Sequence, residues 1–109
     1  MRKDIRDRLI STAKRGEVIF YRELGIGRGK AAGQILGEIC EYEHSRGRPL
    51  LSAIVVNKAK GMPSEGFWGL SAIPQKLTEK QRPVFWAREL NKVIDYWRSH
   101  SQASIRGEV

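Results

Sequence analysis

Residues 28–70 read RGKAAGQILGEICEYEHSRGRPLLSAIVVNKAKGMPSEGFWGL, and the order of patterns in this stretch decides the predicted fold. Residues 30–43 carry apolar side chains at helical spacing, and residues 52–57 follow as an apolar run that predicts a buried strand. A loop rich in lysine and glycine comes next, and residues 66–70 are expected to return as a second strand. Helix, strand, basic turn and strand is the order of elements in a winged helix-turn-helix.

The residues before this stretch predict two helices. Residues 4–15 place their apolar side chains on one helical stripe, and Gly16 follows as a stop signal. Residues 21–24 can form the first helix of a helix-turn-helix. Residues 25–29 contain three glycines and therefore predict its turn.

The residues after the stretch predict a C-terminal helix. Residues 78–81 resemble a capping box, and the apolar stripe from Trp86 to Trp97 indicates a helix that ends near Ser99. We therefore expect an α+β fold: a winged helix-turn-helix with three helices, a small antiparallel hairpin or three-stranded wing, and an added C-terminal helix. Residues 1–99 are expected to form one domain and residues 100–109 a mobile tail.

The charge of the chain favours a polyanionic partner. Its 109 residues include 20 Lys and Arg against 12 Asp and Glu, a net charge of +8. Residues 1–60 hold 13 of the basic and 7 of the acidic side chains, so the excess lies mainly in that part. Such a surface attracts phosphates and makes nucleic acid the first partner to consider.

Two other compositional features exclude classes of protein. The chain has no run of 18 apolar residues, which argues against a membrane span and makes a cytoplasmic location the default expectation. Its single cysteine, Cys40, allows no disulfide within the chain and no zinc site built on cysteine pairs. No cofactor and no metal is expected.

Two glycines in the predicted recognition helix suggest a close approach to its backbone. Gly33 and Gly37 lie about one turn apart, and a glycine inside a helix costs roughly 0.5–1 kcal/mol relative to alanine. A nucleic-acid backbone explains the pair, and so does close packing of another helix of the same domain. The predicted contact residues are these glycines with Arg22, Arg28, Lys30, Gln34, Arg46, Arg48, Lys58 and Lys60.

Two alternatives come from other functional classes. Glu41 and His44 share a helix face and could hold a metal ion near Ser52, as in a small metal-dependent hydrolase or nuclease. An exposed Trp68 or the C-terminal helix could instead build a homodimer in a protein-interaction module.

The chain also resembles a known family over about residues 16–70. Residues 16–24 (GEVIFYREL), residues 30–36 (KAAGQIL), Val55-Val56-Asn57 and Gly66-Phe67 are similar to the winged-helix domain of the O6-alkylguanine-DNA alkyltransferases and alkyltransferase-like proteins. In that family the recognition helix enters the minor groove of DNA while a base flips out. The resemblance implies that Arg28 or Lys30 holds the base stack open and that Tyr21 lies near the phosphate of the flipped nucleotide.

The chain departs from this family at the reactive position. The alkyl-accepting Pro-Cys-His-Arg motif is replaced by residues 51–54 (LSAI), and Cys40 belongs to a different element. No thiol can accept an alkyl group there, so alkyl transfer is not expected. The sequence therefore predicts a non-enzymatic nucleic-acid-binding module, with double-stranded DNA as the favoured partner.

Overall fold

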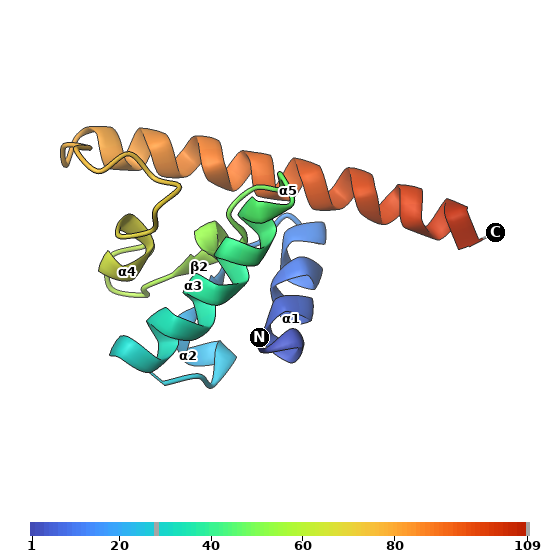
Figure 1. The fold of residues 1–109 in the computed structure, drawn as a ribbon, viewed down its shortest axis with the longest axis horizontal. Helices are drawn as coiled ribbons and strands as arrows, with labels where there is room; N and C mark the ends of the chain where they lie inside the picture. The colour runs from blue at the N-terminus through green and yellow to red at the C-terminus, as the bar shows by residue number, and fades with distance from the viewer. Residues whose placement is uncertain (28, 109) are drawn as a thin grey trace.

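The computed structural model describes residues 1–27 and 29–108, with the backbone alone for residue 65 and residues 101–108. The fold is α+β, mostly helical, with one two-stranded sheet. In Figure 1 the long α5 runs along one side of the molecule and the other elements lie beneath it. The elements are α1 (Lys3–Lys14), β1 (Ile19–Phe20), α2 (Tyr21–Leu24), α3 (Gly29–Ser45), the 3-10 helix η1 (Leu51–Ile54), β2 (Val55–Val56), α4 (Glu65–Trp68) and α5 (Gln81–Glu108).

The three helices predicted at residues 4–15, 21–24 and 30–43 are confirmed. Helices α1, α2 and α3 begin and end within two residues of the predicted bounds. Gly16, Gly25, Gly27 and Gly29 all have positive φ, which glycine adopts without steric cost and which ends α1 and shapes the turn before α3.

The sheet is parallel, so the prediction of an antiparallel hairpin or three-stranded wing is wrong. Strand β1 pairs with β2, with Ile19 opposite Val55 and Phe20 opposite Val56. The chain passes through α2 and α3 between the two strands, and such a crossover is what a parallel pair requires. Within the described residues, the one antiparallel pairing is an isolated bridge between Asn57 and Met62.

The predicted second strand at residues 66–70 is also wrong, because residues 65–68 form the short helix α4. Phe67 is buried and Trp68 is half-buried, and their rings meet edge to face with centroids 5.1 Å apart. In a strand these neighbours would point to opposite faces. A helical turn lets both rings pack against the core.

The predicted strand at residues 52–57 forms only at Val55–Val56, because residues 51–54 adopt the helical turn η1. Helix α5 holds this turn at both ends. The buried carboxylate of Glu89 accepts a hydrogen bond from the backbone N–H of Leu50 (2.9 Å), and the indole N–H of Trp86 donates to the carbonyl of Ala53 (2.8 Å). Burial of the segment is as predicted.

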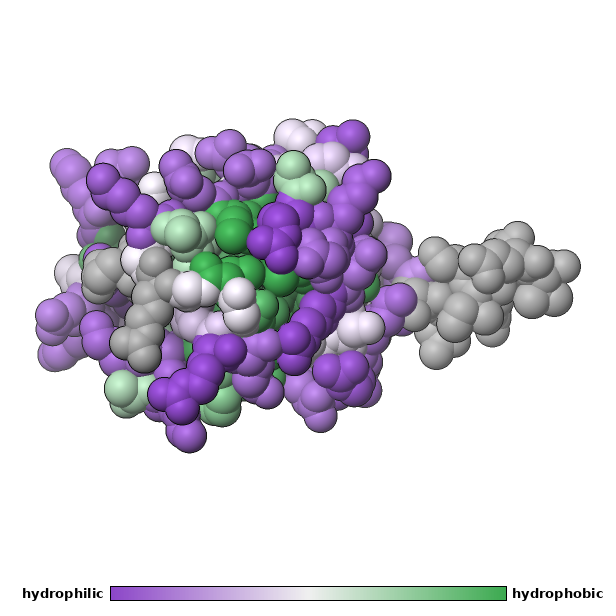
Figure 2. Space-filling view, turned by 90° about the horizontal axis from the view of Figure 1, so that it is seen from below, coloured by the Kyte–Doolittle hydropathy of each residue, from purple (hydrophilic) through white to green (hydrophobic). Residues whose placement is uncertain are grey.

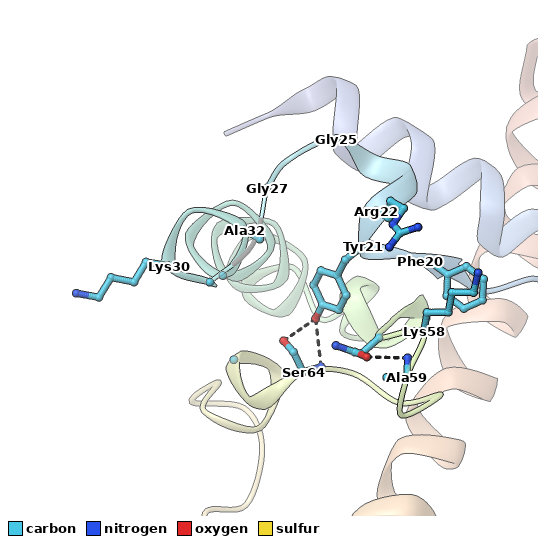
Figure 3. A pocket seen from close by; sticks show the side chains of 14 residues that line it. Phe20, Tyr21, Arg22, Gly25, Gly27, Lys30, Ala32, Lys58, Ala59 and Ser64 are labelled. Carbon is cyan, nitrogen blue, oxygen red and sulfur yellow. Dashed lines mark hydrogen bonds between the residues drawn. The ribbon is translucent and has the colours of Figure 1, made fainter.

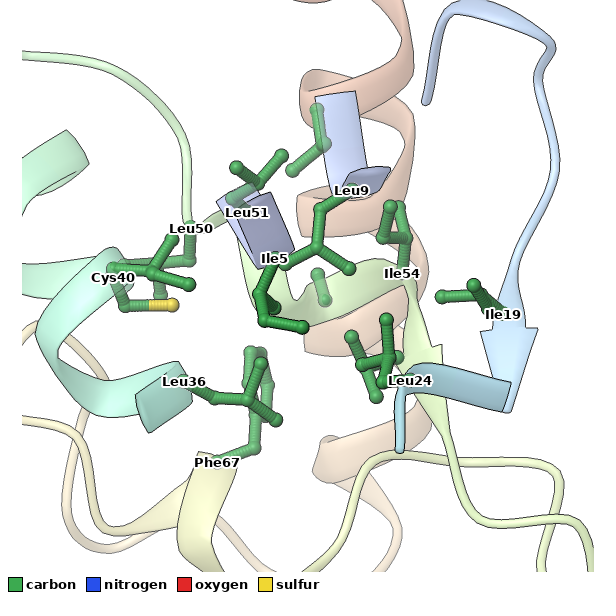
Figure 4. Close-up of a cluster of buried hydrophobic side chains, with 14 of the residues drawn as sticks. Ile5, Leu9, Ile19, Leu24, Leu36, Cys40, Leu50, Leu51, Ile54 and Phe67 are labelled. Carbon is green, nitrogen blue, oxygen red and sulfur yellow. The ribbon is translucent and has the colours of Figure 1, made fainter. Parts of the chain in front are cut away.

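The hydrophobic core lies between α1, α3, α5 and the η1–β2 segment. Ile5 and Leu9 of α1 meet Leu36 of α3 and Ile54 of η1, and Figure 4 shows these side chains converging from their elements. Val93 of α5 closes the same core and is fully buried. The core therefore fixes α3, which supplies one wall of the candidate site.

Helix α5 begins as predicted and ends later than predicted. Thr78 and Gln81 form the expected capping box, with reciprocal backbone-to-side-chain hydrogen bonds of 2.9 and 3.2 Å. The helix does not end near Ser99 but continues to Glu108, and its last turns extend beyond the other elements in Figure 1. None of the helices in the described residues combines the length and apolarity needed to cross a lipid bilayer.

A buried carboxylate ties α1 to the end of α3. Glu43 has no exposed side-chain surface, and its two oxygens accept hydrogen bonds from Nε of Arg6 and Nε of Arg48, each at 2.7 Å. This bonding, with the charge of Glu43, raises the pKa of the Arg48 guanidinium. One carboxylate thus joins a helix near the N-terminus to the loop that follows α3.

Replacing Glu43 with glutamine should lower the free energy of unfolding by about 3 kcal/mol, because two largely buried guanidinium groups lose their counter-charge. Urea denaturation measures this change. The matched control is Glu41→Gln, at an exposed position two residues away, which should change the value by less than about 0.5 kcal/mol. Equal stability of the two variants would contradict a structural role for the Glu43 carboxylate.

Candidate functional site

An open groove of about 1030 Å³ lies at the N-terminal end of α3. Its lining comes from three segments, the first two of them consecutive in sequence: β1 and α2 with the glycine turn after them, the first turns of α3, and residues 57–66. The parallel pairing of β1 with β2 brings the first and third of these segments together, since α2 follows β1 directly and Asn57 follows β2 directly.

The groove combines an apolar floor with a cationic rim. Phe20, Tyr21 and Ala32 contribute aromatic and aliphatic surface. Figure 2, which views the molecule from below, shows apolar side chains gathered in the middle of this face and hydrophilic ones around them. A flat, partly apolar ligand that carries negative charge would match both features.

Three predicted contact cations lie on the rim. Lys30 extends from the first turn of α3 on one side of the groove. Arg22 of α2 and Lys58, which follows β2, lie on the other side (Figure 3). All three are exposed, so their charged ends are free to meet an anion.

The side chain of Tyr21 spans the groove and forms hydrogen bonds at the start of α4. Its hydroxyl lies 2.8 Å from Oγ of Ser64 and accepts a hydrogen bond from the backbone N–H of Ser64 at 3.2 Å (Figure 3). Beside it, the Asn57 side chain accepts a hydrogen bond from the backbone N–H of Ala59 at 2.9 Å. This turn fixes the loop that carries Lys58.

The two glycines of α3 have different surroundings. Gly33 is exposed on the groove, and a Cβ added there would meet no atom within 4 Å. Gly37 is half-buried, and a Cβ there would touch Cδ2 of Leu70 at 4.0 Å. Of the two explanations open at the sequence level, an accessible backbone fits Gly33, whereas packing against the protein's own side chain fits Gly37.

The structure does not bring every predicted contact residue to the groove. Gln34 and Lys60 are exposed but do not line it. Arg46 and Arg48 lie beyond the C-terminal end of α3, where Arg48 is bonded to Glu43. Arg28 lies outside the described residues.

The residues of the two alternative functions lie apart. Ser52 is buried, with its Oγ 2.9 Å from Sγ of Cys40, whereas Glu41 and His44 are exposed. No group of three potential metal-binding side chains occurs among the described residues. Trp68, proposed for a dimer contact, is half-buried against Phe67 and Phe85.

Sequence reasoning missed Ser64, Gly66 and Phe20 as groove residues. Ser64 meets Tyr21 across 43 positions of sequence, and no local pattern signals such a contact. Ser64 itself is the one local sign, because serine is a preferred residue at the N-cap of a helix.

Comparisons with protein-family models, with curated proteins and with solved structures find no match to this chain.

Because the Cys40 thiol is buried, we expect the free energy of unfolding to fall at alkaline pH. Burial raises its pKa from an ordinary value of 9.0 to about 11. Between these values the unfolded chain releases the thiol proton and the folded chain keeps it, so this contribution to stability is complete below pH 9 and is lost as pH rises toward 11. The loss should reach about 2–3 kcal/mol at its limit.

Urea denaturation of wild type and Cys40→Ala at pH 8 and pH 10.5 isolates this contribution, since other titrating groups are common to both proteins. The stability advantage of wild type over the variant should shrink at the higher pH. An advantage that stays constant would show that the thiol titrates normally in the folded protein.

Proposed function

We propose that this chain is a non-enzymatic nucleic-acid-binding module that uses α3 as its recognition helix, with double-stranded DNA as the favoured ligand. The single observation that supports it best is the groove at the start of α3. At this groove, segments that are far apart in the sequence bring Arg22, Lys30 and Lys58 to the rim of an apolar, partly aromatic floor. The net charge of +8 supports the same class of partner.

The two parts of the groove suit the two parts of a nucleotide. Phosphates bind to mobile cations on a rim, while the face of a base packs on aromatic or aliphatic surface. The volume of about 1030 Å³ is at the upper end for small-molecule sites and can admit a whole nucleotide. The resemblance to the alkyltransferase family adds a precedent for a base that leaves the duplex near Tyr21 and Lys30.

No chemical step is part of this proposal. Ser52 occupies the position that matches the family's reactive cysteine. Its side chain is buried and forms a hydrogen bond with the thiol of Cys40. Binding without reaction is therefore the expected behaviour.

Removing two rim cations should weaken binding strongly. Lys30→Ala/Lys58→Ala should raise the Kd for a fluorescein-labelled duplex roughly tenfold or more at low salt, and the slope of log K against log salt should fall by about two. Fluorescence anisotropy measures both. The control is Lys14→Ala/Lys76→Ala, which removes the same charge from exposed positions outside the groove. Equal effects of the two double variants would overturn the groove as the binding site.

The glycines of α3 provide a test independent of charge. Gly33→Ala should raise the free energy of unfolding by about 0.5–1 kcal/mol, because the helix gains propensity and the new methyl group meets nothing. It should weaken binding, since the methyl group projects into the groove. Gly37→Ala should give a similar gain in stability with unchanged affinity. A Gly33→Ala protein that binds as wild type would contradict close approach at this position.

A further inference from the structure

A second cationic cluster lies at the opposite end of α3 from the groove. It contains Arg6 of α1 with Arg46 and Arg48, which follow α3. Glu43 is the carboxylate that Arg6 and Arg48 contact, and it is completely buried beneath them. The cluster therefore places three positive charges over one negative charge.

The guanidinium groups are held in place by aromatic rings. The central carbons of Arg6 and Arg48 lie 5.2 and 5.6 Å from the ring centre of Tyr42, and 5.7 and 5.9 Å from that of Trp97. Arg46 stacks more closely on Tyr42, at 4.0 Å. Such contacts fix the guanidinium planes and leave their edges available for hydrogen bonds.

The N–H groups of this cluster that make no hydrogen bond within the described part of the protein suit an oxyanion as ligand. Arg6 contacts Glu43 through Nε, and within the described residues its terminal nitrogens have no acceptor. Arg6 and Arg48 keep 20% and 19% of their side-chain surface exposed, and Arg46 is exposed. Ordered guanidinium groups with unused donors match phosphate oxygens in both charge and geometry.

We propose that Arg6, Arg46 and Arg48 form a second contact surface for the phosphodiester backbone of nucleic acid, separate from the groove. The proposal rests on the proposed function for the identity of the ligand. The 17 residues of α3 span about 25 Å, so one nucleotide cannot reach both surfaces, whereas an extended nucleic acid can. An acidic protein segment offers similar oxygens, but nucleic acid is favoured because the groove on the same helix can hold the same polyanion.

The test compares a long and a short ligand. Arg46→Ala removes the exposed member of the cluster and leaves both ion pairs of Glu43 in place. With a 24-base-pair labelled duplex, the Kd should rise roughly threefold to tenfold and the salt slope should fall by about one. With a labelled dinucleotide, which is too short to span the length of α3, the affinity should stay unchanged. Arg88→Ala, at an exposed position on α5, is the matched control.

Several outcomes would overturn the second surface. Arg46→Ala and Arg88→Ala could affect the duplex equally, or Arg46→Ala could weaken both ligands by the same factor, as a general field effect would. Binding of a glutamate-rich peptide that depends on Arg46, with duplex binding unaffected, would assign the cluster to a protein partner.

The groove proposal fails separately. It fails if Lys30→Ala/Lys58→Ala leaves dinucleotide binding intact, and in that case an effect of Arg46→Ala on the duplex would still support the second surface. Wild type that binds neither labelled ligand at low salt would overturn both proposals.

Discussion

The arrangement of this protein depends on a carboxylate that water does not reach. Glu43 lies at the end of α3 and bonds to Arg6 of α1 and to Arg48 in the following loop. A buried charge of this kind is tolerated only when it is fully paired, so separating the three side chains would destabilise the fold. Their pairing sets the direction of α3 against α1, and with it the position of the groove at the other end of α3.

Helix α5 supplies the second constraint. Trp86 and Glu89 bond to the backbone of the segment from Leu50 to Ala53, and Val93 fills the core beneath them. These contacts keep η1 as a helical turn and deliver β2 beside β1. The groove is a consequence of that pairing, because the residues immediately after each strand form its walls.

The two ends of α3 present different chemistry. At the N-terminal end an open, glycine-lined groove has cations only on its rim. At the C-terminal end the arginines are ordered by Glu43 and by the rings of Tyr42 and Trp97. A polyanion that extends along this helix would meet mobile lysines at one end and fixed guanidinium groups at the other. The guanidinium groups would be more selective than the lysines for the geometry of the phosphates that they contact.

The sequence by itself determined the features that repeat at short spacing. The apolar stripes of α1, α3 and α5, the stop at Gly16, the capping box at Thr78 and the burial of residues 50–56 all follow from local periodicity and backbone preference. Arg22, Lys30, Gly33 and Lys58 could be chosen as candidates because charge and glycine placement are visible in the sequence, and Tyr21 because of the resemblance to the alkyltransferase family.

Only the tertiary structure decided which of these candidates share a surface. Parallel pairing of β1 with β2 and the contact of Tyr21 with Ser64 depend on segments more than 30 residues apart. The same holds for the pairing of Glu43: helical spacing places it on the apolar stripe with Leu36 and Ile39, but its partner Arg6 comes from α1, 37 residues away. Burial and pairing are properties of the whole packed chain, because a charged side chain can be buried only where a distant partner meets it.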